Sequence, residues 1–413
     1  MTSCEEAVAA GEIEGVGLER IAADFGTPCY VYDAAQLQAA CAQVLALAAP
    51  LQARVCYAVK ANGNLSLLHL IRDAGLGFDV SSAVELQRVA QAGAKPADVI
   101  MTGPGKSAVD LKAAVEAGVA EIVCDSAGEL ARLETIASEA GRKVAAGVRL
   151  NPAIDAPSHP HLATGRGEAK FGVGADEAAK MFSRIAASSV LETGSLSCHI
   201  GSQIATSEPY IELAKVMLAF AERLDKEKCP PARLDLGGGF GIGDAKERPA
   251  ATPLAGVAAW LAEHGAGRSY GFQPGRSVVG RCGILLARVE YRKDRHLIVD
   301  AGMTELLRPC LYGAVHGVAH VGSKPAPAGA LDVVGPVCEN ADFLAQGVAL
   351  DAGPGDLVAV FDCGAYASAM ASGYNGRLRA CEVLVKDGVA RLIRARESFA
   401  DSIRAEDGAF DWL

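Results

Sequence analysis

The sequence predicts an α/β fold, a (β/α)8 TIM-like barrel, followed by a β-rich domain built as a sandwich or a barrel. Short apolar runs begin near residues 55, 77, 99, 121 and 145, at intervals of 22, 22, 22 and 24 residues. Segments of helical periodicity, such as 83–92 and 127–140, lie between them. A chain of 413 residues is also too long for one compact core, so we expect two domains.

The repeat is preceded by one strand and one helix. Residues 27–32 have the composition of a strand, and Asp33 can cap a helix that ends near Leu47. The first strand of the repeat begins at Val55. Three further candidate strands, at 195–199, 233–236 and 270–273, bring the total to eight. Eight consecutive β/α units predict a closed barrel.

The pattern changes near Arg276, where long helical periodicity ends. Strand-like runs then dominate, at 284–289, 296–299, 331–337, 357–361, 383–385 and 389–393. We therefore predict a barrel over residues 34–276 and a β-rich domain made of residues 1–33 together with 277–413. The polar segment 153–168 is predicted to be a long loop over the barrel mouth.

Composition excludes several classes of protein. Half of the residues are hydrophobic and 21% are charged, which excludes a largely disordered chain. A net charge of −10, spread along the sequence, does not favour nucleic acid as a partner. The acidic N-terminus lacks the features of a secretory signal, and no apolar run approaches the roughly 20 residues that span a bilayer. We expect a cytoplasmic protein. The 12 cysteines show no C-x-x-C spacing and so predict neither a disulfide framework nor a zinc site.

Lys60 is the single charge in the apolar run 55–62, where the first barrel strand ends. One interpretation is a side chain that extends to solvent from a strand end. The other is an amine placed to condense with an aldehyde such as pyridoxal phosphate. Polar residues also follow the other strands, which favours chemistry at the barrel's C-terminal face.

The consecutive glycines Gly237, Gly238 and Gly239 follow the seventh strand, and Pro274-Gly275-Arg276 follows the eighth. Loops at these places often bind phosphate in barrels, so we favour a phosphate site over a flexible turn. A dinucleotide motif does not fit, because position 242 is Ile. Gly105-Lys106-Ser107 is not a nucleotide P-loop, because Ile100 occupies the position of its first glycine.

The histidines do not predict a metal site. His199 ends the sixth strand, where it could be a core residue or could stack on a planar cofactor. His316 and His320 have helical spacing but lack the glutamate of a metalloprotease helix. His159 and His161 lie in a loop without acidic partners.

Taken together, these stretches resemble the fold-type III pyridoxal-phosphate decarboxylases, which are alanine racemase-like in fold. The resemblance covers nearly the whole chain, at residues 57–62, 78–86, 159–173, 199–203, 237–239, 274–277, 299–312, 335–339, 364–366, 374–375 and 382–383. The loop with Thr164-Gly165 and Lys170-Phe171-Gly172 and the segment from Asp300 to Tyr312 point to the diaminopimelate branch rather than to the ornithine or arginine branch.

The resemblance implies roles for individual residues. Lys60 would bind pyridoxal 5'-phosphate covalently, His199 would stack on its ring, and Cys338 would act as an acid, so these three are the expected catalytic residues. The expected cofactor-binding residues are Lys60, Asp79, His199, Ser202, Gly238, Gly239, Gln273, Gly275, Arg276 and Tyr374. The expected substrate-binding residues are Arg276, Arg308, Tyr312, Glu339 and Tyr374. Cys338, Glu339 and the tyrosines among these residues lie in the second domain. By composition alone they would be a buried cysteine, a surface acid and packing tyrosines.

The resemblance also implies a carboxy-lyase that converts meso-diaminopimelate to L-lysine and CO2, and a homodimer in which Cys338 and Glu339 enter the partner's active site. One departure is that Gln273 stands where the family has a glutamate that pairs with the pyridine nitrogen. A neutral amide gives no net charge stabilisation there, which suggests a weaker electron sink. The alternatives are a specialised decarboxylase or epimerase for a related amino diacid, and a non-catalytic cofactor-binding paralogue. Thr304-Glu305 and Leu378 are smaller departures.

Overall fold

The computed structural model describes residues 3–154, 170–243, 252–322 and 329–406. Most of the predicted mouth loop, with His159, His161 and Thr164-Gly165, therefore lies outside the described residues. The described chain divides into two compact units. We call residues 38–243 and 252–278 the barrel unit, and residues 3–37 and 279–406 the sheet unit.

The barrel unit contains the predicted closed barrel of eight parallel strands within the described residues, in the order β10-β11-β4-β5-β6-β7-β8-β9. These strands are β4 (Arg54–Ala58), β5 (Gly77–Val80), β6 (Val99–Met101), β7 (Glu121–Cys124), β8 (Val144–Arg149), β9 (Leu191–Ser197), β10 (Arg233–Asp235) and β11 (Tyr270–Phe272). The barrel prediction is thus confirmed, although β9 begins four residues earlier than predicted.

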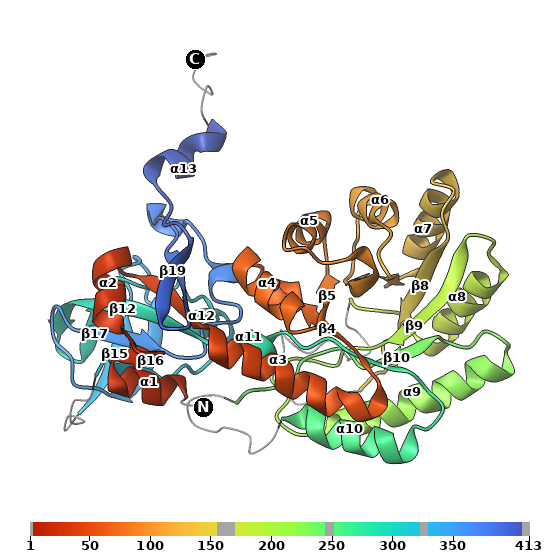
Figure 1. Cartoon of the computed structure of the whole chain (residues 1–413), viewed down its shortest axis with the longest axis horizontal. Coiled ribbons are helices and arrows are strands. Elements are labelled where there is room, and N and C mark those ends of the chain that lie inside the picture. Colours follow the sequence, from red (N-terminus) through yellow and green to blue (C-terminus); the bar gives the residue numbers. More distant parts are fainter. Residues whose placement is uncertain (1–2, 155–169, 244–251, 323–328, 407–413) are drawn as a thin grey trace. The chain divides into compact units, whose positions relative to one another are not determined.

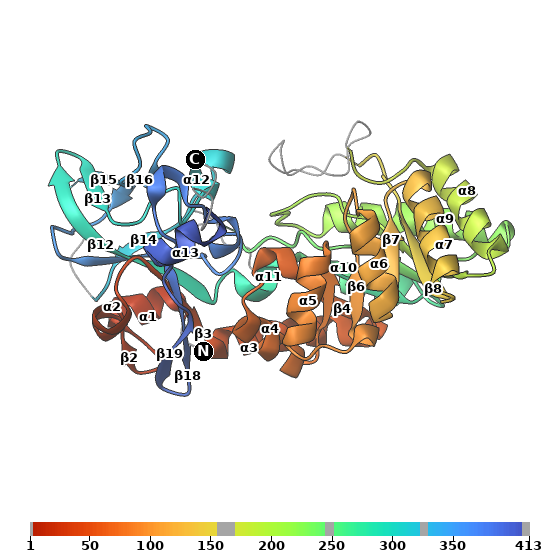
Figure 2. The same ribbon diagram turned by 90° about the horizontal axis from the view of Figure 1, so that it is seen from above.

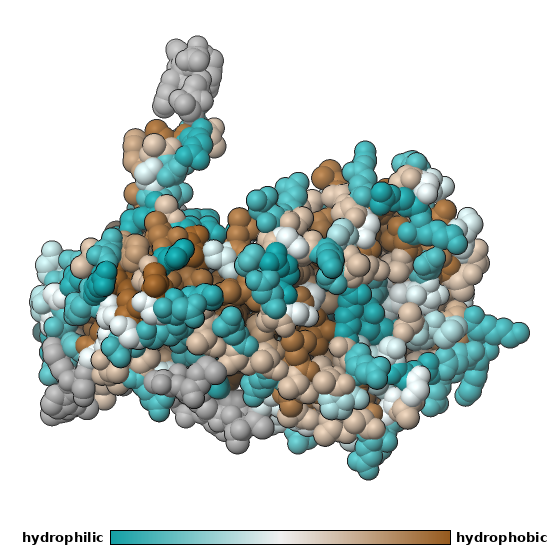
Figure 3. Space-filling model, viewed as in Figure 1, coloured by the Kyte–Doolittle hydropathy of each residue, from teal (hydrophilic) through white to brown (hydrophobic). Residues whose placement is uncertain are grey.

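Helices lie around the outside of these strands (Figures 1 and 2). They are α4 (Leu65–Asp73), α5 (Ala83–Gln91), α6 (Ala108–Ala117), α7 (Ala127–Glu139), α8 (Ala175–Ala187), α9 (Glu208–Lys226) and α10 (Pro253–His264). Serine N-caps begin three of them: the side chains of Ser82, Ser107 and Ser126 each accept a hydrogen bond from the backbone N–H three residues later. Hydrophilic residues cover much of the viewed surface over α5, α6 and α7 (Figure 3).

Helix α3 (Ala34–Ala48) begins as predicted, with Asp33 Oδ1 accepting from the backbone N–H of Gln36 at 2.9 Å. By length and composition, the segment Ala34–Leu51 is the one stretch of the described chain that could cross a membrane. Its buried residues include Leu37, Cys41 and Val44, a three- and four-residue spacing that is typical of a helix packed on a protein core.

The sheet unit contains a mixed sheet of nine strands within the described residues. The strands are β3 (Cys29–Asp33), β12 (Gly283–Lys293), β13 (His296–Val299), β14 (Val318–His320), β15 (Ala330–Val334), β16 (Phe343–Ala349), β17 (Leu357–Val360), β18 (Cys381–Lys386) and β19 (Val389–Arg394). The N-terminal strand β3 pairs with both β12 and β18, so the first residues of the chain complete a sheet formed mainly by the last third.

Several elements were not predicted. Strands β14 and β16 are among them, and β14 shows that the segment leading to His320 is extended rather than helical. The short helices and strands before residue 27 were also missed: α1 (Cys4–Ala10), β1 (Glu12–Ile13), β2 (Val16–Gly17) and α2 (Leu18–Phe25). Short helices α11 (Arg276–Val279), α12 (Arg308–Tyr312) and α13 (Phe399–Ile403) complete the described α-helices.

Candidate active site

The predicted residues fall into two groups, one in each unit. The barrel-unit group is Lys60, Asp79, His199, Ser202, Gly238, Gly239, Gln273, Gly275 and Arg276, all at or just beyond the C-terminal ends of β4, β5, β9, β10 and β11. Strands β10, β11, β4 and β5 are consecutive in the barrel, so most of these residues share one part of its C-terminal face. The sheet-unit group is Arg308, Tyr312, Cys338, Glu339 and Tyr374.

Lys60 lies in a 3-10 turn, Val59–Ala61, directly after β4. The turn is held next to the eighth strand, because Ala58 N–H donates to Pro274 O at 3.0 Å. Lys60 is exposed. The positive charge of Lys60 is one of several influences on the pKa values of Asp79 and His199, and it favours a lower value for each. Lys60 therefore lies close to both side chains.

Asp79 is a buried carboxylate near the end of β5. Its Oδ1 accepts from Thr102 Oγ1 at 2.6 Å, whereas its buried Oδ2 has no hydrogen-bond partner among the described residues. Burial raises the pKa of Asp79, and the charge of Lys60 opposes this effect. One acceptor of this carboxyl group is therefore available to a bound molecule.

His199 lies two residues beyond β9 rather than at its last position. Gly238 N–H donates to His199 Nδ1 at 3.3 Å, so Nδ1 is the unprotonated nitrogen and the proton lies on Nε2. Burial lowers the pKa of His199 well below its ordinary value, and the charges of Lys60 and Arg149 add to this effect. The imidazole is therefore neutral at pH 7.

The glycine loop packs against two neighbouring segments that leave no room for side chains. A Cβ on Gly238 would lie 2.0 Å from Gln273 O, and a Cβ on Gly239 would lie 2.0 Å from Gly201 O. Gly237 N–H donates to Asp235 Oδ1 at 2.8 Å, and Gly238 N–H donates to His199. These two amides are therefore engaged within the protein.

The better candidate for binding an anion is Arg276, at the start of α11. Its side chain is buried, and its Nη2 donates to Ser202 Oγ at 3.4 Å. A Cβ on Gly275 would come within 3.1 Å of Ala61 Cβ, so this glycine allows close packing against the turn that carries Lys60. A guanidinium and a hydroxyl placed together suit a phosphate group.

Gln273 follows β11 and is 9% exposed. Its backbone N–H donates to Gly237 O at 2.7 Å, which ties it to the glycine loop. Its side-chain Nε2 is buried and has no hydrogen-bond partner among the described residues. The carboxyl group of Asp235 is also buried, and the Gln273 side chain is one of the groups that lower the pKa of Asp235.

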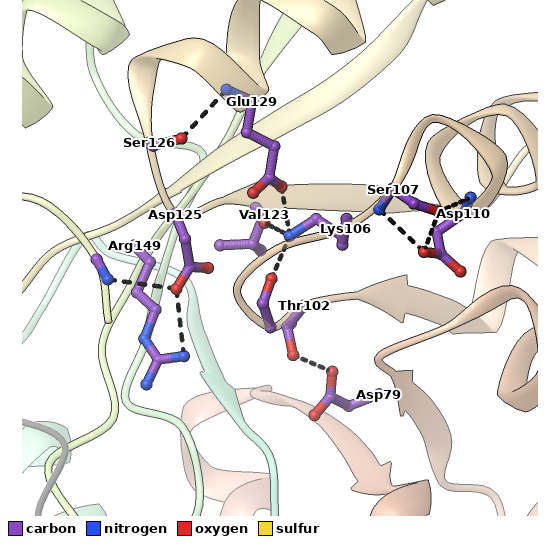
Figure 4. Close-up of polar contacts among 12 residues, drawn as sticks. Asp79, Thr102, Lys106, Ser107, Asp110, Val123, Asp125, Ser126, Glu129 and Arg149 are labelled. Atoms are coloured by element: carbon purple, nitrogen blue, oxygen red, sulfur yellow. Dashed lines mark hydrogen bonds and ion pairs between the residues drawn. The ribbon is translucent and has the colours of Figure 1, made fainter. Parts of the chain in front are cut away.

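Sequence reasoning missed a buried polar network beside this group (Figure 4). Lys106, which was considered only as a P-loop lysine, has a fully buried side chain: its Nζ donates to Gly103 O and Val123 O at 2.6 Å each and lies 2.5 Å from Glu129 Oε1. The spacing between a lysine and a glutamate on successive β/α units carries no recognisable signal, so only the fold could reveal this pair.

Arg149 forms a second part of the network. Its Nη1 lies 3.6 Å from Asp125 Oδ2, and its guanidinium lies over the ring of Phe171, 4.8 Å from the centroid. Gly172 N–H also donates to Asp125 Oδ2, at 3.3 Å. These contacts fix the Lys170-Phe171-Gly172 segment at the ends of β7 and β8.

In the sheet unit, the buried guanidinium of Arg308 contacts a histidine. Arg308 Nη1 donates to His316 Nε2 at 2.8 Å, and His316 Nδ1 donates to Phe361 O at 2.7 Å. His316 is therefore a positioning partner of Arg308. Tyr312 is half-buried at the end of the same short helix, α12.

Cys338, Glu339, Tyr374 and Asn375 form one exposed cluster. Tyr374 Oη donates to Glu339 Oε1 at 2.5 Å, and Asn375 Nδ2 donates to Cys338 Sγ at 3.6 Å. The composition-based expectation of a buried cysteine and packing tyrosines is wrong, because Cys338 is exposed and Tyr374 is 51% exposed. In contrast, Thr304 and Glu305 are buried and bonded to each other, which gives these two departures from the family a structural role.

The barrel-unit residues fit a phosphorylated aromatic cofactor. The exposed amine of Lys60, the neutral ring of His199 and the buried pair Arg276–Ser202 offer a nucleophile, a stacking surface and a phosphate site. The unpartnered acceptor of Asp79 and the unpartnered donor of Gln273 are polar atoms that a bound ring can satisfy.

Comparison with known proteins decides the family. Residues 34–280 match the family model described as pyridoxal-dependent decarboxylase, pyridoxal binding domain. The chain belongs to the pyridoxal-dependent decarboxylases. The predicted enzyme class, fold and pyridoxal phosphate cofactor are thereby confirmed.

Relatives of this pyridoxal-dependent decarboxylase are similar over nearly their whole length. Diaminopimelate decarboxylase of Pseudomonas aeruginosa is 42% identical, with 95% of this chain and 96% of the relative covered. The enzyme of the same name from Aquifex aeolicus is 39% identical, over 94% and 93%. The crystal structure of diaminopimelate decarboxylase from Helicobacter pylori complexed with L-lysine has a TM-score of 0.91 at 36% identity, covering 95% of this chain and all of that one.

Proposed function

We propose that this enzyme decarboxylates meso-diaminopimelate to L-lysine and CO2. The observation that carries the proposal is full-length similarity to several diaminopimelate decarboxylases, at 38 to 42% identity and more than 90% coverage of both chains. A relative's structure contains L-lysine, the product of such a reaction.

We infer that Lys60 binds the cofactor covalently, that Arg276 and Ser202 bind its phosphate, and that the neutral imidazole of His199 lies against its ring. When bound, pyridoxal phosphate supplies an electron-accepting ring that stabilises the electron pair left at Cα when CO2 departs. A neutral imidazole suits this position, because a cation against the ring face would disfavour protonation of the ring nitrogen by like-charge repulsion. Asp79, Gly238, Gly239, Gln273 and Gly275 complete the proposed cofactor-binding set.

The sheet-unit residues, together with Arg276 of the barrel unit, are proposed to act on the substrate. Arg308 and Arg276 would bind carboxylates, because a guanidinium matches the carboxylate in shape and charge. Glu339 would bind the distal amine, with Tyr312 and Tyr374 beside the substrate, and Cys338 would protonate Cα. The exposure of Cys338, Glu339 and Tyr374 in one chain supports a role at the active site of a partner subunit in a homodimer. We also propose a cytoplasmic location.

Two measurements test these proposals. Borohydride reduction of the holoenzyme followed by peptide mapping is expected to place the cofactor label on Lys60, and a label on another lysine would contradict the assignment. Initial rates across meso-diaminopimelate, lysine, ornithine and arginine test the substrate. A preference for a diamine with one carboxylate would contradict the role of Arg308 in binding a second carboxylate.

Gln273 is the observation that favours a second candidate, a decarboxylase or epimerase for a related amino diacid. A neutral amide at this place alters the electronic demand on the ring. Exchange of the Cα proton with solvent in the absence of CO2 release would favour the epimerase.

A further inference from the structure

Cys338 and Glu339 lie in the loop of residues 335–342, which joins β15 to β16. The ends of this loop are held together, because Gly335 N–H donates to Asp342 O at 3.0 Å. Inside the loop, Glu339 N–H donates to Val337 O at 2.8 Å, and Asp342 N–H donates to Glu339 O at 3.1 Å. These bonds give the loop its local shape, but they all lie within it.

The side chain of Asp342 attaches the loop to the rest of the sheet unit. Asp342 is 4% exposed. Its Oδ2 accepts from Val337 N–H, in the loop, at 2.6 Å, and its Oδ1 accepts from Met303 N–H at 2.6 Å. Both carboxylate oxygens are therefore used, each in a short hydrogen bond to a backbone donor. One buried side chain thus joins the loop to residues 302–305.

Two glycines leave room for this carboxylate. A Cβ on Gly302 would lie 2.6 Å from Asp342 Oδ1, and a Cβ on Gly335 would collide with Asp342 Oδ2. Neither glycine has a left-handed backbone conformation. The space that the Asp342 carboxylate occupies therefore accounts for both glycines.

Residues 302–305 also contact the segment that carries Tyr374. Ser372 N–H donates to Thr304 O at 3.0 Å, two residues before Tyr374. The hydroxyl of Tyr374 in turn donates to Glu339 Oε1 at 2.5 Å. The loop and the Tyr374 segment are therefore both fixed on residues 302–305, and Asp342 makes the connection on the side of the loop.

We propose that Asp342 is a positioning residue that sets where Cys338 and Glu339 stand for the reaction. This inference rests on the proposed function, in which Cys338 is the acid and Glu339 binds the distal amine. Cys338 and Glu339 are exposed, so packing around their own side chains does not hold them in place. Groups that transfer a proton or bind a substrate must be placed within about 0.5 Å, and the buried carboxylate of Asp342 supplies that placement from beneath the loop.

The test uses two variants and a matched control, each prepared as holoenzyme. Asp342→Asn keeps the shape of the side chain but replaces one acceptor with an NH2 group, so one backbone N–H loses its partner. Gly302→Ala keeps the carboxylate and displaces it. The control is Asp332→Asn, on β15 of the same hairpin, whose buried carboxylate accepts from Gly347 N–H at 2.9 Å. Urea unfolding measures the stability of each variant.

The first measurement reads the place of Glu339 without any turnover. The hydrogen bond to Glu339 raises the pKa of Tyr374. Displacement of the loop should therefore lower the midpoint of the Tyr374 phenol titration in Asp342→Asn and in Gly302→Ala, whereas Asp332→Asn should leave it unchanged. The titration is followed by ultraviolet absorbance, and each variant is compared with the same variant carrying Tyr374→Phe. A midpoint that stays at the wild-type value in both loop variants would overturn the inference.

The second measurement is a double-mutant cycle on the release of CO2 from meso-diaminopimelate. We expect Asp342→Asn to lower kcat by about tenfold or more, and Asp332→Asn to leave kcat and KM within about twofold of the wild type. In a chain that already carries Cys338→Ala, Asp342→Asn should lower kcat by less than about twofold, because there is no acid left to misplace.

An equal loss of kcat from Asp342→Asn with and without Cys338 would overturn the inference. The same loss of kcat in Asp332→Asn would overturn it as well, because it would show a general effect of destabilising the hairpin. If the wild type released no CO2 from meso-diaminopimelate, the proposed function would be contradicted instead, and the Tyr374 titration would still decide whether Asp342 places the loop.

Discussion

The buried pair of Lys106 and Glu129 allows a quantitative prediction about barrel stability. Lys106→Met keeps the length of the side chain but leaves the Glu129 carboxyl group buried without its cation. Burial already raises the pKa of Glu129, and Lys106 opposes that effect, so the substitution raises this pKa further. Removing one partner of a buried pair costs about 3 to 5 kcal/mol in general.

Here the charge-dependent part of that cost has an upper limit, because Glu129 can take up a proton instead. From its ordinary pKa of 4.5, protonation at pH 7 costs about 3 kcal/mol, and at pH 5 it costs less than about 1 kcal/mol. Lys106→Met should therefore destabilise the barrel much more at pH 7 than at pH 5. Two carbonyl groups, Gly103 O and Val123 O, also lose a donor, but that cost does not depend on pH.

Urea unfolding at both pH values measures the difference in unfolding free energy between the variant and the wild type. The matched control is Lys106→Met with Glu129→Gln, which removes the titrating group and should show the same cost at both pH values. An equal cost for the single variant at pH 7 and pH 5 would refute this reasoning, as would a double variant as pH-dependent as the single one.

Three further predictions concern the candidate site. Gly238→Ala places a Cβ 2.0 Å from a backbone oxygen. We expect at least about tenfold weaker cofactor binding, measured by cofactor titration, and a loss of about 1 to 3 kcal/mol of stability, measured by urea unfolding. Gly128→Ala is the control, because its Cβ would meet nothing within 4 Å. Burial raises the pKa of Asp235 from 3.8 to about 6, so its ionisation above that pH costs folding free energy. Asp235→Asn should therefore stabilise the cofactor-free protein by about 3 kcal/mol at pH 7.5 and by little at pH 4. A constant difference in unfolding free energy between these pH values, measured by urea unfolding, would contradict this. The hydrogen bond to Glu339 raises the pKa of Tyr374, so Glu339→Gln should lower the midpoint of the Tyr374 phenol titration. The titration is followed by ultraviolet absorbance, with a Tyr374→Phe variant as the blank. An unmoved midpoint would show that the pair does not form in solution.

The barrel could be predicted from the sequence because several of its strands, β5 and β6 among them, lie in short, largely buried apolar runs. The run before Lys60 and the run before Asp79 are each bounded by polar or glycine residues, and helical periodicity separates them. The order of parallel strands then follows from chain order, which by itself predicts that Lys60, Asp79, His199 and Arg276 lie at one face of the barrel.

The details that sequence could not supply depend on contacts between distant strands. Lys106 gave only a partial motif, and its partner Glu129 is recognisable only once α7 packs beside the end of β6. No sequence pattern places Asp235 beside the strand that leads to Gln273, because that neighbourhood depends on the register of β10 and β11. Strands β14 and β16 lacked clear alternation, and β14 contains a histidine whose spacing suggested a helix.

The sheet unit illustrates a second limit. A cysteine next to a glutamate gives no indication of exposure, and apolar composition favoured burial of Cys338. The structure shows it exposed, beside Asn375 and the Tyr374–Glu339 pair. Exposure of such a cluster depends on the turn after β15, which no short-range pattern predicts.

The measurement that tests the central claim most directly is the stoichiometry of the reaction with meso-diaminopimelate. Purified holoenzyme is incubated with this substrate, CO2 is trapped, and the amino-acid product is identified by mass and chirality. We predict one CO2 and one L-lysine for each meso-diaminopimelate consumed, and neither product from Lys60→Ala. Consumption or racemisation of the substrate without CO2, or CO2 without L-lysine, would contradict the proposed function.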